Sequence, residues 1–199
     1  MTAATVETER QEYAYEVYDE TIDRTIGFAE LELERDFDRL HTWFGYDHVK
    51  PDWQLDLPRS EFRLELDAKV SDDHLTLYIG YIDHVPMSYW ETYDAKDDVL
   101  SECYDVHPDD RGIHVLLGPP EYVARGYGTA MIQAITAFQF ETTDAKRIVG
   151  EPDIRSERTH HVLDKCHFDR KGEISLPDKD AMLVHCERDR FYEESAYDE

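Results

Sequence analysis

The stretch that most constrains the fold runs from Asp110 to Met131 and joins a strand-like pattern to a helix-like one. Residues 113–117 alternate as a β-strand does, and Gly118-Pro119-Pro120 ends the strand because proline has no amide for the ladder. Arg125-Gly126-Tyr127-Gly128-Thr129 then opens a segment with apolar residues at helical spacing. Those apolar residues are Met131, Ile132, Ile135 and Phe138. The sequence therefore predicts a strand, a glycine-rich turn and a helix.

This arrangement is suited to holding a phosphate group. Glycines allow the backbone to approach an anion closely, and the unpaired amides of the first helical turn point toward it with the helix dipole behind them. An ordinary strand-to-helix turn is the alternative, because a single GxG before a helix is weak evidence.

The same stretch resembles motif A of the GNAT acetyltransferases, where the loop before the helix holds the pyrophosphate of acetyl-CoA. More narrowly, residues 104–188 resemble the acetyltransferases of hydroxamate siderophore biosynthesis, which acylate N-hydroxylysine or related N-hydroxydiamines. The matching pieces are Tyr104-Asp105, Asp109-Asp110-Arg111-Gly112-Ile113-His114, Leu117-Gly118-Pro119-Pro120-Glu121-Tyr122, Arg125-Gly126-Tyr127-Gly128, Glu151-Pro152-Asp153-Ile154-Arg155 and Leu176-Pro177-Asp178-Lys179. The match is thin before Asp83.

The order of expected elements fits the fold that this resemblance implies: an α/β (α+β) GNAT fold with a mixed central sheet flanked by helices. We expect strands at 25–33, 74–83, 86–93, 113–117, 146–150, 168–174 and 181–187, and helices at 34–44, 59–70, 129–141 and 156–167. Residues 46–58 are expected to form a loop. We predict an acidic N-terminal extension over residues 1–20, a single acyltransferase domain over 21–192 and an acidic, solvated tail over 193–199.

The resemblance implies acetyl-CoA as the acyl donor. No metal is expected, because the Cys and His residues lack the spacing of a metal site. The residues assigned to coenzyme A are Val115, Leu117, Arg125, Gly126, Tyr127, Gly128, Thr129 and Ser156. Val115 and Leu117 lie on the central strand, whose backbone amides polarise the thioester in GNAT enzymes. Ser156 is also a natural N-cap for the helix that follows it.

His114 and Asp153 are the predicted catalytic residues. His114 lies in the middle of the central strand, and imidazole titrates near neutrality. Asp153 follows the next strand and is expected across the same cleft. The siderophore acetyltransferases have a His and an Asp at these positions, implicated in substrate binding and proton removal. A buried core histidine is the alternative for His114.

The acceptor, a small N-hydroxylated amine, is expected to bind beside strand 86–93. Tyr89, Glu91 and Tyr93 share one face of this strand by period two. The resembling family has a glutamate flanked by aromatics here, together with a tryptophan-containing wall to which we assign Trp53. Core packing of Trp53 and solvent exposure of Glu91 are the alternatives.

Two departures from the family pattern bear on this reading. Val123 stands where the general GNAT pattern has Arg or Gln, and Ala124 stands where glycine is frequent. The expected helix at 156–167 also lacks the tyrosine that protonates the leaving thiolate in many GNAT enzymes. An aminoglycoside-type or other small-amine N-acetyltransferase, a longer acyl donor and a non-catalytic acyl-CoA-binding domain therefore stay open as alternatives.

The formal net charge of −25 over 199 residues is spread along the whole chain, and Lys is scarce. Because salt screens such self-repulsion, this surface is typical of a halophilic protein. The sequence contains no basic stripe, so nucleic acid is not expected as a partner. The chain has no apolar run of membrane-spanning length and no signal-peptide pattern, which predicts a cytoplasmic protein without a membrane partner. A homodimer is an option that the sequence leaves open.

The three cysteines, Cys103, Cys166 and Cys186, have no paired spacing. Their odd number is typical of a reducing compartment and argues against both a disulfide framework and a zinc site.

Overall fold

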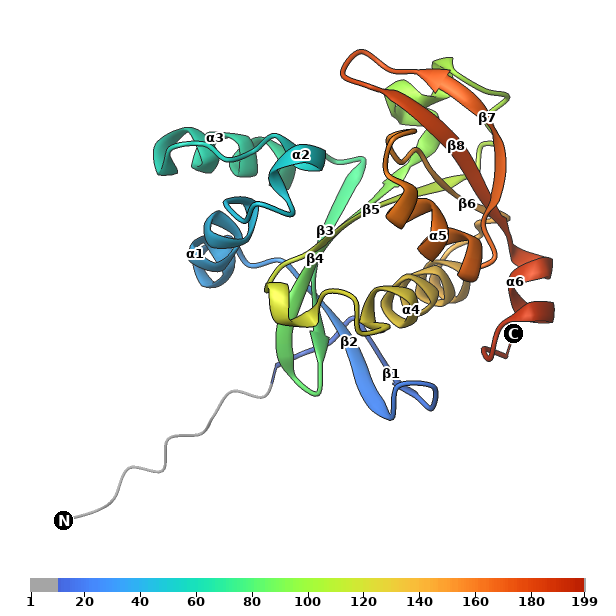
Figure 1. Ribbon diagram of the computed structural model, residues 1–199, viewed down its shortest axis with the longest axis horizontal. Coiled ribbons are helices and arrows are strands. Elements are labelled where there is room, and N and C mark those ends of the chain that lie inside the picture. The colour runs from blue at the N-terminus through green and yellow to red at the C-terminus, as the bar shows by residue number, and fades with distance from the viewer. Residues whose placement is uncertain (1–10, 199) are drawn as a thin grey trace.

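A computed structural model describes residues 11–198, which form an eight-stranded sheet with helices on both faces (Figure 1). The strand order is β1-β2-β3-β4-β5-β6-β8-β7, and β5–β6 is the parallel pair among antiparallel ones. The strands are β1 (Tyr15–Asp19), β2 (Arg24–Glu30), β3 (Leu75–Ile82), β4 (Val85–Asp94), β5 (Arg111–Leu117), β6 (Arg147–Gly150), β7 (Asp169–Ser175) and β8 (Asp180–Glu187). The helices are α1 (Leu33–Phe44), α2 (Lys50–Trp53), α3 (Arg59–Val70), α4 (Tyr127–Thr142), α5 (Glu157–Lys165) and α6 (Arg188–Glu194). This mixed sheet with flanking helices confirms the predicted fold class.

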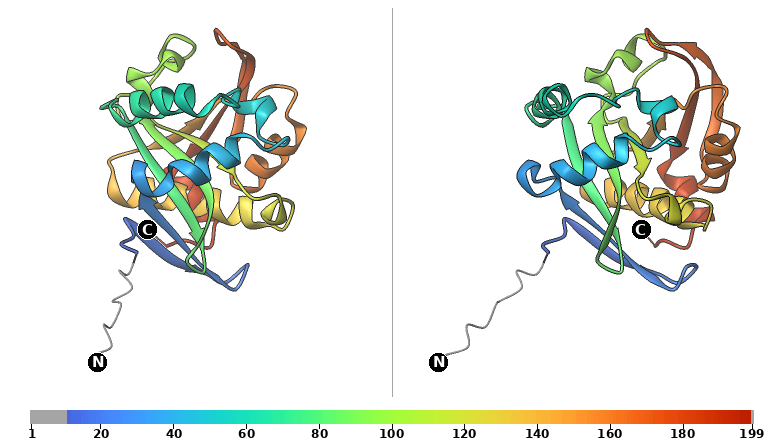
Figure 2. Two further views of the ribbon diagram at one scale, coloured as in Figure 1. Left: turned by 90° about the vertical axis from the view of Figure 1, so that its left-hand side faces the viewer. Right: turned by 60° about the vertical axis from the view of Figure 1, so that its left-hand side comes forward.

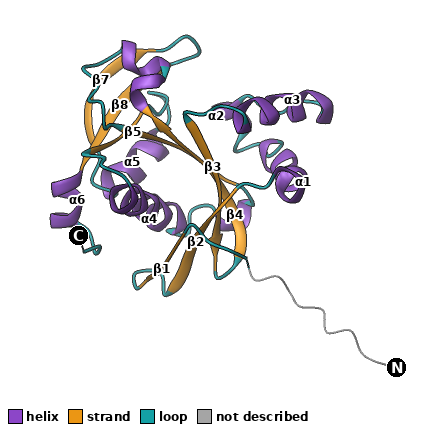
Figure 3. Ribbon diagram, turned by 180° about the vertical axis from the view of Figure 1, so that it is seen from behind, coloured by secondary structure: helices purple, strands orange, loops and turns teal. Residues whose placement is uncertain are grey.

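Two helical layers cover opposite faces of the sheet (Figures 1 and 3). On one face, α4 is buried on nearly all sides, as expected of a helix that is apolar all round, and α5 packs beside it. On the other face, α1 and α3 pack over β2, β3 and β4 through a second apolar cluster. Figure 2 shows α1 and α3 on the side of the sheet away from α4. The central strands are therefore covered by different layers on their two faces.

The sheet opens between β5 and β6. Their backbone pairing covers only Arg111 with Ile148 and Gly112 with Val149, whereas β5 is paired with β4 along the whole length of β5. Just past the end of β5, the Gly118 amide donates to Met87 O, on the β4 side. Because backbone directions alternate along a strand, the amides of Val115 and Leu117 point to the opposite side, into the opening. The backbone amides of these two residues are thus free of β4 and face the widening gap between β5 and β6.

The C-terminal part of the expected N-terminal extension is ordered into a strand. Residues 15–19 form β1, an edge strand that pairs with β2, and the Tyr15 ring stacks on Phe138 of α4 at 5.0 Å. Glu16 and Tyr18 on one face of the strand are exposed, whereas Tyr15, Val17 and Asp19 on the other face are partly or fully buried. Residues 1–10 of the predicted extension lie outside the described part of the chain.

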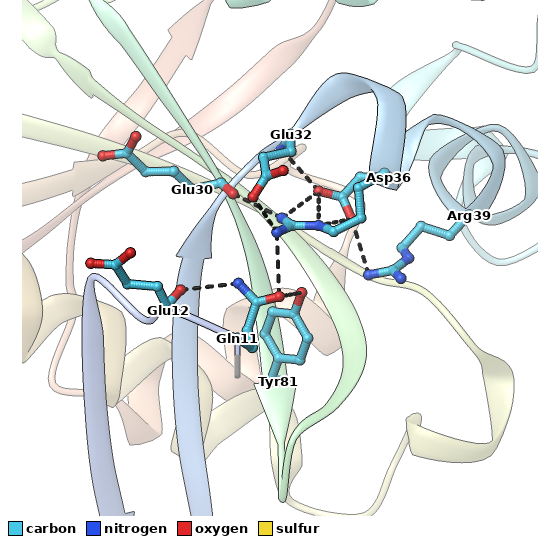
Figure 4. Close-up of polar contacts among 8 residues, drawn as sticks. Gln11, Glu12, Glu30, Glu32, Asp36, Arg39 and Tyr81 are labelled. Carbon is cyan, nitrogen blue, oxygen red and sulfur yellow. Dashed lines mark hydrogen bonds and ion pairs between the residues drawn. The ribbon is translucent and has the colours of Figure 1, made fainter. Parts of the chain in front are cut away.

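Gln11 begins a polar cluster that ties this segment to α1 (Figure 4). Its side-chain oxygen accepts from Tyr81 OH and Arg35, each at 3.3 Å. Arg35 also pairs with Asp36 at 2.7 Å, and Arg39 lies 3.1 Å from the same carboxylate. Asp36 is fully buried, so these two arginines supply the pairing that a buried charge requires.

Two further elements were not predicted. A short helix, α2, lies inside the expected loop 46–58, and α6 follows β8 directly. The predicted acidic tail begins within α6, and Tyr197 packs its ring 5.7 Å from Phe191. Aromatic residues among the acidic ones give this segment an apolar side. The prediction of a solvated tail considered only the acidic residues and therefore missed it. Residue 199 lies outside the described part of the chain.

Candidate active site

A row of three side chains crosses the opening between β5 and β6. Glu91 of β4 lies directly opposite His114 of β5, and its Oε2 is 3.0 Å from His114 Nδ1. On the other side of the ring, His114 Nε2 lies 2.6 Å from Oε1 of Glu151, which follows β6. Continuing the β5–β6 register past Gly112 and Val149 brings residues 114 and 151 opposite each other. Side chains thus connect the two strands where the backbone ladder has ended.

The two glutamates determine the charge of His114. Glu91 and Glu151 are 2% and 7% exposed, whereas the His114 side chain is 31% exposed. Burial by itself would lower the pKa of His114, but the charges and hydrogen bonds of Glu151 and Glu91 outweigh it and raise that pKa to about 10. His114 is therefore an imidazolium at neutral pH that donates one proton to each carboxylate.

Further donors complete the coordination of the two carboxylates. Lys69 of α3 and Tyr89 both reach Oε1 of Glu91, at 2.9 and 2.8 Å. Tyr93 donates to Oε2 of Glu151 at 3.0 Å, and Lys179 lies 3.5 Å from Oε1. Although burial favours their neutral forms, these donors and His114 lower the pKa of both glutamates to about 2. Charges of alternating sign therefore run Lys69, Glu91, His114, Glu151, Lys179.

Aromatic side chains form the walls around His114. The Trp53 ring lies edge-on 6.1 Å from the His114 ring, and the Tyr93 ring lies 4.9 Å from it. Tyr93 is fully buried and passes so close to Gly112 that a Cβ there would come within 2.0 Å of the ring. The structure thus brings Trp53, Tyr89, Glu91 and Tyr93 together around His114, and it excludes a solvent-facing Glu91.

Asp153 is not a partner of His114. Its carboxylate accepts from the backbone amide and the guanidinium of Arg155, at 2.8 and 2.6 Å. These hydrogen bonds lower the pKa of Asp153, so it is an ionised carboxylate near the row with its side chain 15% exposed. Glu151, two residues earlier, occupies the place beside the imidazole that the sequence reading gave to Asp153.

The glycine-rich turn has the backbone conformation expected before a helix N-terminus. Gly126 is the N-cap of α4 with φ +87°, a region that residues with a Cβ rarely adopt, and it is exposed. Ala124, where glycine is frequent in the family pattern, also has a positive φ of 63°. Gly128 lies next to the end of β5, where a Cβ would meet Leu117 Cδ1 at 3.2 Å. The turn is therefore shaped mainly by backbone conformation.

The remaining predicted coenzyme A residues lie at this end of the opening. Arg125 is exposed, and Tyr127, Gly128 and Thr129 form the first turn of α4. The carbonyl of Leu117 is 2.9 Å from His48 Nε2, on the edge facing the opening. Ser156 takes the N-cap position of α5, but its hydroxyl bonds to Thr159 Oγ1 at 2.8 Å and makes no capping hydrogen bond to an amide.

Sequence reasoning did not assign roles to Glu151, Lys69, Lys179 or His48. Glu151 and Lys179 belong to stretches already noted for their family resemblance, so both could have been listed as candidates. Lys69 and His48 come from a part of the chain where the resemblance is thin, and only the packing of α3 and of the α1–α2 loop brings them to the site.

The arrangement of a splayed strand pair, a glycine-rich helix N-terminus and a charged pocket beside the central strand defines an acyltransferase site of the GNAT type. A family model described as an acetyltransferase (GNAT) domain matches residues 32–176. The chain therefore belongs to the GNAT acetyltransferase family.

Known proteins bear out this assignment at the levels of sequence and fold. The N-hydroxyputrescine acetyltransferase of Acinetobacter baumannii is 37% identical over 169 residues, covering 83% of this chain and 79% of that protein. A solved structure of an uncharacterised protein from Bacillus halodurans has a TM-score of 0.87 at 38% identity, covering 90% of this chain and 92% of that one. A solved aminoglycoside acetyltransferase in complex with coenzyme A has a TM-score of 0.77 at 22% identity, covering 85% and 98%, and shares the fold.

Two kinds of feature are absent from residues 11–198. None of the helices there is both long and apolar enough to cross a membrane. Groups of three or more His, Cys, Asp or Glu side chains able to hold a metal ion do not occur in the same range.

Proposed function

We propose that this enzyme transfers the acetyl group of acetyl-CoA to the hydroxylated nitrogen of an N-hydroxydiamine or N-hydroxylysine, forming a hydroxamate for siderophore biosynthesis. The observation that carries the choice of acceptor is the geometry of His114, because each of its two ring nitrogens lies within hydrogen-bond distance of a buried carboxylate. An imidazolium already bound to two carboxylates is a poor base for an ordinary amine, which is itself protonated at pH 7. An N-hydroxylated amine is less basic and arrives with a free nitrogen lone pair.

The relative from Acinetobacter baumannii supports this choice, since its name specifies an N-hydroxydiamine acceptor. In the proposed complex, the pyrophosphate of acetyl-CoA binds the first-turn amides of α4 with Arg125, and Val115 and Leu117 present their amides to the thioester carbonyl. Trp53, Tyr89, Glu91 and Tyr93 contain the acceptor. Asp153, ionised and partly exposed, accepts the hydrogen bond of the N–OH group.

A competition experiment tests the acceptor class. Acetyl-CoA turnover is measured with N-hydroxylysine, N-hydroxycadaverine, lysine, cadaverine and an aminoglycoside. We expect kcat/KM for the hydroxylated amines to exceed that for their parent amines by roughly 10⁴-fold, since a site built to bind the hydroxyl leaves buried polar groups unpaired without it. Equal or better kcat/KM for the parent amines would refute the siderophore assignment and favour a small-amine acetyltransferase.

A further inference from the structure

The leaving thiolate has no assigned proton donor, because α5 contains no tyrosine. The described structure offers a donor elsewhere. Both ring nitrogens of His114 face a carboxylate, which favours the doubly protonated ring, and Nε2 lies on the side of the ring that faces Glu151 across the opening. That opening is also where the amides of Val115 and Leu117 point, so the imidazolium and the predicted oxyanion donors border the same space.

We propose that His114 acts first as an acid: its Nε2–H protonates the sulfur of the departing coenzyme A, and the acceptor nitrogen then restores the proton to the ring. The inference rests on the proposed acyl transfer and assigns the proton path within it. As the C–N bond forms and the C–S bond breaks, the sulfur gains one proton and the nitrogen loses one. The imidazolium ends as it began, and no outside acid or base is consumed.

The neighbours of His114 are arranged to keep it protonated. Four side chains face the ring: Glu91 and Tyr93 of β4, Glu151 after β6 and Trp53 of α2. Tyr89 and Lys69 lie on the far side of the Glu91 carboxylate, and Lys179 lies on the far side of the Glu151 carboxylate. Both carboxylates touch the ring directly, whereas both lysines lie one residue further away. The nearer negative charges therefore dominate. Glu91 and Glu151 are positioning residues: they act on the reaction through the imidazolium.

If His114 acts as an acid, the side of the pH profile on which kcat/KM falls is defined. A catalytic acid must be protonated, so kcat/KM should fall on the alkaline side as His114 loses its proton, whereas a catalytic base would produce a limb on the acid side. Glu91→Gln removes a negative charge beside the ring and should move the alkaline limb down by about 1–3 pH units. Lys69→Met removes a positive charge from the far side of Glu91 and should move it up. Loss of packing alone would not give shifts of opposite sign.

The experiment measures thiol release from acetyl-CoA against pH with the best acceptor found, whether or not it is hydroxylated. The control is Glu65→Gln, the same change on an exposed glutamate of α3, which should leave the profile unmoved. Ionisation of the acceptor itself also gives an acid-side limb, but only a limb set by His114 follows the Glu91 and Lys69 substitutions. If these substitutions move the acid-side limb, or if the wild type has no alkaline limb, the proposal is wrong.

A second measurement does not depend on the variants folding. Nitrogen NMR of the histidine rings in the wild-type protein, with His114 assigned from the spectrum of His114→Gln, should show both ring nitrogens protonated at pH 7. A neutral ring at pH 7 would overturn the acid role. Because this NMR measurement needs no acceptor, it separates failure of the proton path from failure of the proposed function.

Discussion

The two ends of the opening beside β5 are built on different principles. At one end, the row Glu91, His114 and Glu151 consists of side chains fixed by ion pairs and tyrosine hydroxyls, with both carboxylates buried. At the other end, the turn around Gly126 is exposed and gets its shape from backbone conformation. Replacing a side chain in the row should therefore impair turnover, whereas adding a side chain to a glycine of the turn should impair coenzyme A binding.

The largest effect is expected at the turn. Gly126→Asp and Gly128→Asp each place bulk and negative charge where we propose that pyrophosphate binds, and should weaken coenzyme A binding more than about 100-fold in calorimetry. Ala124→Gly is the matched control: it removes a side chain from a positive-φ position and should preserve binding. Unchanged affinity in both aspartate variants would mean that phosphate binds elsewhere.

Substitutions of His114, in the row, and of Asp153, near it, should lower turnover while preserving the affinity for coenzyme A. His114→Ala and Asp153→Ala are each expected to lower kcat on the order of 10²-fold, with coenzyme A affinity within a few-fold of wild type. Because His114→Ala leaves two buried carboxylates without their shared cation, His114→Gln and a melting curve serve as the folding control. Asp164→Ala, which breaks the ion pair between Asp164 of α5 and Arg170 of β7, should retain turnover. Near-normal kcat in the His114 and Asp153 variants would remove both from the mechanism.

The row should also give stability a defined dependence on pH. The folded-state pKa of Glu91 and Glu151 is lowered, so their contribution is present above about pH 4.3 and is lost as pH falls toward 2. The folded-state pKa of His114 is raised, so its contribution is full below about pH 6.5 and is lost as pH rises through 10. Denaturant unfolding should show a drop on the order of 1 kcal/mol or more from pH 6 to pH 10. That drop should shrink in Glu91→Gln; a drop of the same size would assign it to other groups.

The smallest expected effect is that of salt, which should act on the acidic surface and not on the buried ion pairs of the row. Molar KCl should raise the melting temperature by several degrees, because it screens the repulsion of a surface carrying −25, while buried pairs are screened much less. The pH midpoint assigned to His114 should therefore stay in place as salt rises. A melting temperature that is flat or falls with KCl would remove the halophilic reading.

Much of the architecture follows from local pattern. Alternation predicted β3, β4, β5 and β8, helical spacing predicted α1, α3, α4 and α5, and Gly118-Pro119-Pro120 marked the end of β5. Period two also placed Tyr89, Glu91 and Tyr93 on one face, because side-chain direction in a strand is a local property. The predictions failed at β1 and α6, where acidic residues masked short apolar stripes that are stabilised by contact with α4 and β8.

What the sequence by itself determined about this protein is its family and the order of most of its elements. Only the tertiary structure decided that Glu151, and not Asp153, contacts His114, and that Lys69 of α3 reaches Glu91. The reason is that register between β5 and β6 and the docking of α3 are set by packing between segments far apart in the chain. The charge of a histidine is decided by the same packing: His114 carries the neutral-range pKa of any imidazole until the fold brings two carboxylates to its ring.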